Sequence, residues 1–148
     1  MPDYKTALEQ GIAAAKKAAQ ARTEIKKVLG TFKDELLGLT DGKVLVEIKE
    51  LYESEDAMEV LRRASTGLKR RTYQALVAYN PTLETPPVKE LARWKQSENG
   101  YPCALVFGRQ ERQFENRAAL EKGLSELLKD TRVGEVIYML MNEGVSKP

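Results

Sequence analysis

Residues 88–107 read VKELARWKQSENGYPCALVF, and they predict two strands joined by a tight turn. We expect strands at 88–96 and 102–107, the second being the most strand-like stretch of the chain. Between them, residues 97–100 supply turn chemistry with an Asn-Gly pair at the tip. That pair is a strong short-range signal of a hairpin loop. The stretch therefore indicates an antiparallel sheet.

Further strands are expected on both sides of this hairpin. Residues 111–114 follow a turn at 108–110 and predict a short returning strand, so that this region forms a meander of two or three antiparallel strands. Residues 72–79 are rich in aromatic and β-branched side chains, which favours a strand, although a helix also fits. Residues 43–48 alternate as in a strand, whereas the longer segment 43–53 also fits a helical face. We favour a strand at both places.

Four helices are expected around the sheet. Apolar residues recur at helical spacing in each of them, and Asp3 and Asn116 are suited to cap the first and third helix. Their expected bounds are 3–38, 55–65, 117–129 and 133–142.

The order of these elements predicts an α+β fold in a single domain, 1–148. A long N-terminal helix is followed by a core at 43–144 and by C-terminal helices packed on the sheet. Residues 145–148 are expected to be frayed.

The long helix at 3–38 has two interpretations. Its apolar stripe can pack on its own domain, which we favour. The same stripe can be written as heptads, which would allow the helix to project and to pair with a second chain, as a homodimer, or with another partner. Gly11 and Arg22 interrupt the heptad seam, and small alanines dominate its first half.

The composition removes several classes of catalysis. The chain has no histidine and a single cysteine, Cys103. Catalysis by Ser-His or Cys-His pairs is therefore excluded, as are zinc sites built on imidazole or on several thiolates. No phosphate-binding loop is present. We expect no enzyme, no cofactor, no catalytic residue and no metal site. The lone cysteine, the lack of a leader and the short apolar runs predict a cytoplasmic protein without a membrane span.

Five cationic residues within ten positions form the strongest candidate site. They are Arg62, Arg63, Lys69, Arg70 and Arg71, and they follow a run of acidic residues at 47–59. The acidic run is interpreted as a solvated face. For the cations, neutralisation by these neighbours, a protein partner and nucleic acid all remain open.

Two aromatic residues near the Asn-Gly turn, Trp94 and Tyr101, would add anchors to a binding surface if they face outward, although strand aromatics usually form packing pairs. Cys103 is interpreted as a small buried residue.

By elimination, we predict a non-catalytic binding or accessory protein that acts on another protein as a regulator, inhibitor or assembly factor. The predicted partner-binding residues are Arg62, Arg63, Lys69, Arg70, Arg71, Trp94 and Tyr101. A nucleic-acid-binding protein that uses the same cations is the alternative, and it predicts binding that weakens steeply with salt.

Overall fold

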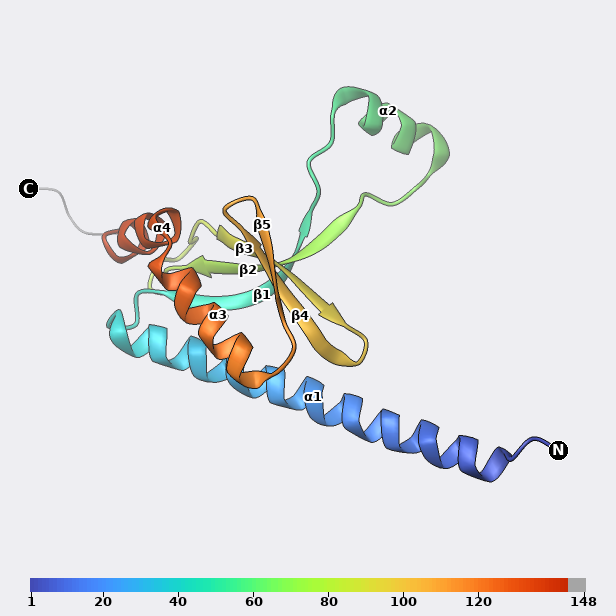
Figure 1. Ribbon diagram of the computed structural model, residues 1–148. Helices are drawn as coiled ribbons and strands as arrows, with labels where there is room; N and C mark the ends of the chain where they lie inside the picture. Colours follow the sequence, from blue (N-terminus) through green and yellow to red (C-terminus); the bar gives the residue numbers. More distant parts are fainter. Residues whose placement is uncertain (144–148) are drawn as a thin grey trace, which may run out of the picture.

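The computed structural model describes residues 1–143, which contain four helices and five strands. In chain order these are α1 (Tyr4–Leu39), β1 (Leu45–Tyr52), α2 (Ala57–Thr66), β2 (Thr72–Tyr79), β3 (Lys89–Ser97), β4 (Gly100–Phe107), β5 (Gln110–Phe114), α3 (Arg117–Lys129) and α4 (Thr131–Met141). The expected α+β class, with a long N-terminal helix, an antiparallel meander and C-terminal helices, is confirmed (Figure 1). Residue 144 and the tail expected to fray at 145–148 lie outside the described residues.

The five strands form one antiparallel sheet in the order β1-β2-β3-β4-β5. Each strand pairs with its neighbour in sequence, which is the commonest arrangement of consecutive strands. The sheet is larger than the meander expected at 88–114, because β1 and β2 also join it. Strand β1 runs four residues beyond the strand expected at 43–48, since its pairing with β2 continues as far as Tyr52 opposite Thr72.

Two helix starts occur where capping side chains predict them. The Asp3 carboxylate accepts a hydrogen bond from the Thr6 backbone N–H at 3.1 Å, and α1 begins at Tyr4. Asn116 accepts one from the Ala119 N–H at 2.9 Å, and α3 begins at the next residue. Each cap satisfies a backbone donor that the first turn of a helix leaves without an intrahelical partner.

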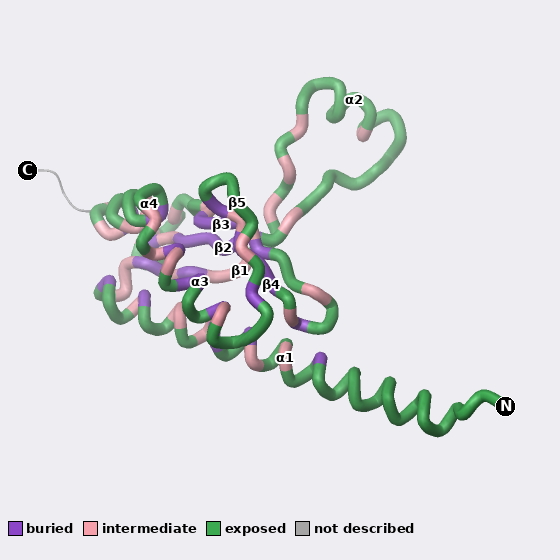
Figure 2. The backbone as a smooth tube through the Cα atoms, viewed as in Figure 1, coloured by how far each residue is buried: buried purple, intermediate pink, exposed green. Residues whose placement is uncertain are grey.

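The core lies between one face of the sheet and α1, α3 and α4 (Figures 1 and 2). Cross-strand neighbours share a face of a sheet, and the pairs Ile48–Leu76 and Trp94–Leu105 supply this one. Trp94 is only 4% exposed. Cys103 is buried as predicted, and burial raises the pKa of its thiol to about 11.

Helix α1 meets the body of the domain at the tip of the β3–β4 hairpin. Gly100, at φ +88°, lies so close to α1 that a Cβ atom there would be 2.7 Å from the Ala21 Cβ. The Arg22 guanidinium donates to the Glu98 carbonyl oxygen at 2.7 Å, and the Tyr101 hydroxyl donates to Glu24 at 2.7 Å. From this point to its C-terminal end, α1 packs on its own domain.

Two segments extend away from this core, and Figure 2 shows no buried residue in either. One is the N-terminal part of α1, residues 4–17, in which every residue is exposed. The other is the connection between β1 and β2, residues 53–71, which carries α2 at its tip (Figure 1). We refer to residues 53–71 as the arm. No helix in the described part of the chain is long and apolar enough to cross a membrane.

Candidate functional site

The arm leaves the sheet as an extension of the β1–β2 pair. Its first residue, Glu53, donates its backbone N–H to the Arg71 carbonyl oxygen at 2.9 Å, one step beyond the last paired residues of the two strands. The Asp56 side chain then accepts from the Glu59 N–H at 2.8 Å and starts α2. Gly67, at φ +70°, ends the helix in the left-handed conformation that glycine adopts without a steric penalty.

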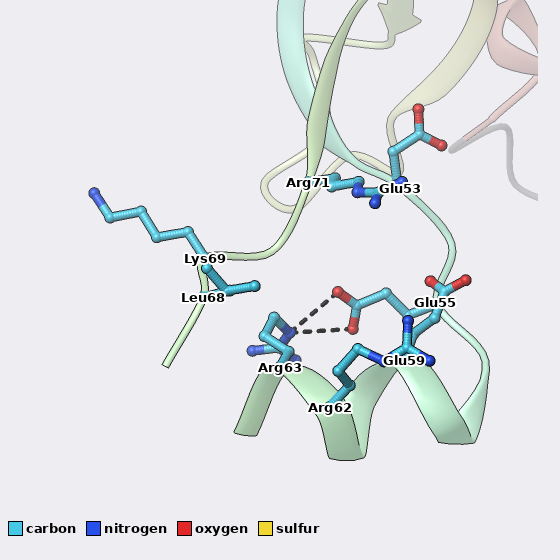
Figure 3. A pocket seen from close by; sticks show the side chains of 8 residues that line it. All are labelled: Glu53, Glu55, Glu59, Arg62, Arg63, Leu68, Lys69 and Arg71. Atoms are coloured by element: carbon cyan, nitrogen blue, oxygen red, sulfur yellow. Dashed lines mark hydrogen bonds and ion pairs between the residues drawn. The ribbon is translucent and has the colours of Figure 1, made fainter. Parts of the chain in front are cut away.

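One side of α2 is charged and faces the rest of the arm. Glu59, Arg62, Arg63 and Thr66 follow the i, i+3, i+4, i+7 spacing that places residues on one face of a helix. The first three of these line a cleft of about 140 Å³ together with Glu53, Glu55, Leu68, Lys69 and Arg71 (Figure 3). The least exposed residue of α2 is a charged one, Arg63.

A fork of hydrogen bonds holds this charged side in place. Arg63 Nε donates to both carboxylate oxygens of Glu55, at 3.1 and 3.2 Å (Figure 3). The Glu55 side chain is only 10% exposed, so this pair is shielded more than an ordinary surface ion pair. The pair therefore fixes which side of α2 faces the strands.

The opposite side of α2 is apolar and faces solvent. It consists of Ala57, Leu61 and Ala64, at the i, i+4, i+7 spacing, with Met58 and Val60 beside them. Met58 is 68% exposed and Leu61 is 63% exposed, and no residue of α2 is buried. A surface helix normally buries its apolar side and exposes its charged side. Helix α2 instead exposes its apolar side to solvent and turns its charged side toward the rest of the arm.

The arm brings together the five cations singled out in the sequence, but in two different roles. Arg63 and Arg70 contact their own chain: Arg70 donates to the Glu53 carbonyl oxygen at 3.2 Å and lies 4.9 Å from the centre of the Tyr52 ring. Arg62, Lys69 and Arg71 have no carboxylate within ion-pair distance among residues 1–143. Neutralisation by neighbouring acids thus accounts for part of the cluster.

Trp94 and Tyr101 are separate from these cations. Both lie on the sheet face that α1 covers, Trp94 in the core and Tyr101 half-buried against Glu24. Burial and then the bond to Glu24 raise the pKa of Tyr101. The condition under which they would act as binding anchors, an outward orientation, is not met for Trp94. The physical reason is that α1 covers the face on which Trp94 lies, whereas strand alternation places its neighbour Arg93 on the opposite face.

Arg93 is the residue near the arm that sequence reasoning missed. On the uncovered face of the sheet, its guanidinium makes two bonds to the Glu53 carboxylate, at 2.8 and 3.2 Å, and lies 4.0 Å from the centre of the Tyr73 ring. The bond to Glu53 raises the pKa of Arg93. Glu53 is the first residue of the arm, so Arg93 ties the base of the arm to the sheet. The available signal in the sequence was strand alternation, which places Arg93 on the face opposite to that of Trp94.

Part of the acidic run, interpreted from the sequence as a solvated face, makes structural contacts instead. Glu53 and Glu55 are engaged by arginines, and Asp56 caps α2. Within residues 1–143, no cluster of His, Cys, Asp or Glu is placed to hold a metal ion.

Comparison of the chain with protein-family models, with curated proteins and with solved structures finds no match. The arm's geometry is therefore the basis for a functional assignment.

Proposed function

We propose that the chain is a non-catalytic binding protein that acts on another protein, as a regulator, inhibitor or assembly factor, and that it holds this partner with the outward side of α2. One observation carries the proposal: the apolar side of an amphipathic helix faces solvent at the tip of an arm, while its charged side is turned inward. Exposed apolar surface of this kind marks interaction sites.

The arrangement favours binding of α2 in an apolar groove of the partner. Met58 and Leu61 are the anchors, because burying each side chain would contribute roughly 1.5–3 kcal/mol. Arg62, Lys69 and Arg71 lie at the rim of the same arm, and their positive charge favours a partner that is acidic around the groove. Rim charges of this kind mainly increase the association rate and the specificity.

Nucleic acid remains the second candidate partner, because the same three cations have no carboxylate partner in the described part of the chain. Phosphate contacts would use them, but they would leave Met58 and Leu61 in water. Three acidic residues, Glu53, Glu55 and Glu59, also line the cleft and oppose a phosphate backbone. We therefore favour a protein.

The cytoplasm is the proposed compartment, since the one cysteine of the chain is a free thiol buried in the core and needs no oxidising environment. A second copy of the chain is a separate partner, and α1 rather than the arm would bind it.

Affinity capture from a cell lysate tests the class of partner. One half of the lysate is treated with nuclease, and both halves are washed at low and at moderate salt. The proposal predicts a discrete protein that is retained in both halves and at both salt concentrations, since apolar anchors are insensitive to screening. Recovery of nucleic acid from the untreated half alone, with loss as salt rises, would support the second candidate.

A charge variant shows which cations take part. Arg62→Glu with Lys69→Glu reverses two charges that hold no contact to a carboxylate of the described chain, so we expect weaker capture with an unchanged fold. Replacing Arg63 or Arg70 would not give a clean result, because both also hold the arm together.

A further inference from the structure

Strand β1 forms one edge of the sheet and has no neighbouring strand on its outer side within residues 1–143 (Figure 1). Its inner side pairs with β2 along its whole length, from Leu45 opposite Tyr79 to Tyr52 opposite Thr72. An edge strand presents a row of backbone N–H and C=O groups that can pair with another extended chain. One hydrogen bond at the end of β1 decides which of its groups point outward.

The Glu53 N–H donates to the Arg71 carbonyl oxygen at 2.9 Å, so the backbone of Glu53 points toward the β2 side. This pair continues the register of β1 and β2 without a shift. In an antiparallel pair, successive residues of a strand direct their backbone groups alternately toward the partner strand and away from it. Ile48, Glu50 and Tyr52 therefore direct their N–H and C=O groups outward.

This outer edge is covered at its beginning and open at its end. Val46 is only 1% exposed, so its outward backbone groups are shielded. Beyond it, Ile48 is half-buried, Glu50 is exposed and Tyr52 is 63% exposed. Among the described residues, no loop and no side chain bonds to the outward backbone groups of these three. We refer to residues 48–52 as the open edge.

We propose that the open edge binds an extended segment of another protein, which adds a strand beside β1. Backbone hydrogen bonds with Ile48, Glu50 and Tyr52 hold the segment, and pairs of side chains across the two strands select its sequence. The segment runs antiparallel to β1, which is the orientation with the more stable pairing. The site is separate from the outward side of α2, so this inference does not rest on the partner proposed for the arm.

Charges at the open edge determine which segment fits. Lys49 and Glu50 are both exposed, and strand alternation places them on opposite faces. Opposite charges directly across a strand pair are stabilising, whereas like charges are destabilising. The segment therefore has a carboxylate opposite Lys49 and a cation opposite Glu50. Opposite Ile48, Leu51 and Tyr52 it has apolar residues.

The acidic residues near the open edge agree with this sequence. Glu47 contacts Lys49 at 3.2 Å, and Glu53 is held by Arg93, so neither requires a further cation in the segment. The ammonium group of Lys49 has three donors and can also contact a carboxylate of the segment. Glu50 has no cation within ion-pair distance among residues 1–143. It is therefore the position at which a cation is most favourable.

The cations near the open edge lie at its two ends. Arg22 and Lys26 line the same groove as Ile48, beside α1. At the other end, the Arg70 guanidinium lies 4.9 Å from the centre of the Tyr52 ring. These positive charges disfavour a cation at either end of the segment, where the apolar residues are placed.

A second copy of β1 does not fit the open edge. The register that pairs the open edge with itself places Glu50 opposite Glu50, and like charges there are destabilising. The register that would set Glu47 opposite Lys49 is centred on Ile48. It requires the outward backbone groups of Val46, which are shielded. The occupant is therefore a segment of a different chain.

Two blocked pentapeptides of the same composition test the site on the full chain. In the antiparallel register, VIKEV places its lysine opposite Glu50 and its glutamate opposite Lys49, and VIEKV exchanges the two charges. We expect VIKEV to bind at least about fivefold more tightly, as measured by NMR titration. In the double variant Lys49→Glu/Glu50→Lys, both replaced side chains are exposed, so the fold should persist and the preference should reverse. No binding of VIKEV at millimolar concentration, or equal binding of the two peptides, would overturn the proposal.

Amide exchange in the same samples tests the strand pairing. In the free chain, the N–H groups of Ile48, Glu50 and Tyr52 should exchange quickly and that of Lys49 slowly, because only the last of these bonds to β2. Saturation with VIKEV should slow the exchange of the first three several-fold. Protection of these groups in the free chain that rises with protein concentration would mean that a second copy occupies the edge, and it would contradict the proposal.

Methylation of the peptide backbone provides a matched control. In VIKEV, the N–H of the central lysine faces Glu50, whereas the N–H of the glutamate that follows it points away from β1. N-methylation at the lysine should abolish binding, and N-methylation at the glutamate should leave it largely unchanged. Equal effects of the two would rule out strand addition. A Leu61→Asp chain should bind VIKEV as the wild type does, which separates failure of this site from failure of the arm.

Discussion

Arg63 Nε donates to both carboxylate oxygens of Glu55, at 3.1 and 3.2 Å, and this fork turns the charged side of α2 toward the strands. The apolar side is left facing solvent. The fork is one of several polar contacts that hold the arm, whose helix has no buried residue. The orientation of the proposed binding surface thus depends on an ion pair that is not part of that surface.

Removing the negative charge of Glu55 should weaken its pair with Arg63 and loosen α2 without unfolding the domain. In Glu55→Gln, we expect amide exchange in residues 57–66 to become several-fold faster, because local opening of the arm is less opposed. The global free energy of unfolding should change by less than about 0.5 kcal/mol, since the arm contributes nothing to the core. Hydrogen exchange measured by mass spectrometry checks both parts. The control, Glu121→Gln, removes an ion pair on α3 and should leave amide exchange in α2 unaffected. Unchanged amide exchange of residues 57–66 in Glu55→Gln would refute the role given to the fork.

A methyl group at Gly100 should separate α1 from the hairpin tip. Gly100→Ala places a Cβ atom 2.7 Å from the Ala21 Cβ, at a φ of +88°. We expect the free energy of unfolding to fall by about 2–4 kcal/mol, from overpacking together with backbone strain. Gly108→Ala is the control, since its φ is +61° but its Cβ would meet nothing within 4 Å. It should lower the free energy of unfolding only by the contribution of backbone strain. Urea denaturation measures both variants, and equal losses would show that the close approach to α1 is unimportant.

The burial of Cys103 predicts a loss of stability at alkaline pH. Burial raises the pKa of this thiol from 9.0 to about 11. The unfolded chain therefore releases the thiol proton first as pH rises above 9.0. The contribution of this thiol to the free energy of unfolding should fall between pH 9.0 and about 11 and should be constant below that range. Urea denaturation at several pH values checks this. Cys103→Ala should show a shallower decline over the same range, because the thiol no longer contributes, whereas parallel curves for the two chains would argue against this cause.

Much of the fold follows from local signals in the sequence. Strand β2 and helix α3 occupy the predicted ranges, 72–79 and 117–129, because turn and capping residues mark their ends. The extent of β1 did not follow, because its second half carries charged residues and is stabilised by pairing with β2 rather than by burial.

The candidate site was predicted only in part, for a physical reason. The sequence places five cations close together, and the structure keeps them on one arm. Strand alternation puts Arg93 and Trp94 on opposite faces, but it does not say which face α1 covers. Likewise, the spacing of apolar and charged residues in α2 shows that the helix is amphipathic. The direction in which its apolar side faces is set by the contact between Arg63 and Glu55.

The most direct test of the account is the amount of partner protein that an arm variant captures. In Met58→Asp/Leu61→Asp, two exposed apolar side chains become charged, so the fold should persist while the proposed anchors are lost. The control, Leu39→Asp, makes the same kind of change at a side chain that is 79% exposed at the end of α1. We predict that the control captures the partner as the wild type does and that the arm variant captures at least tenfold less, equivalent to about 1.4 kcal/mol or more of lost binding energy. Equal capture by all three folded chains would contradict the central claim that the outward side of α2 binds the partner.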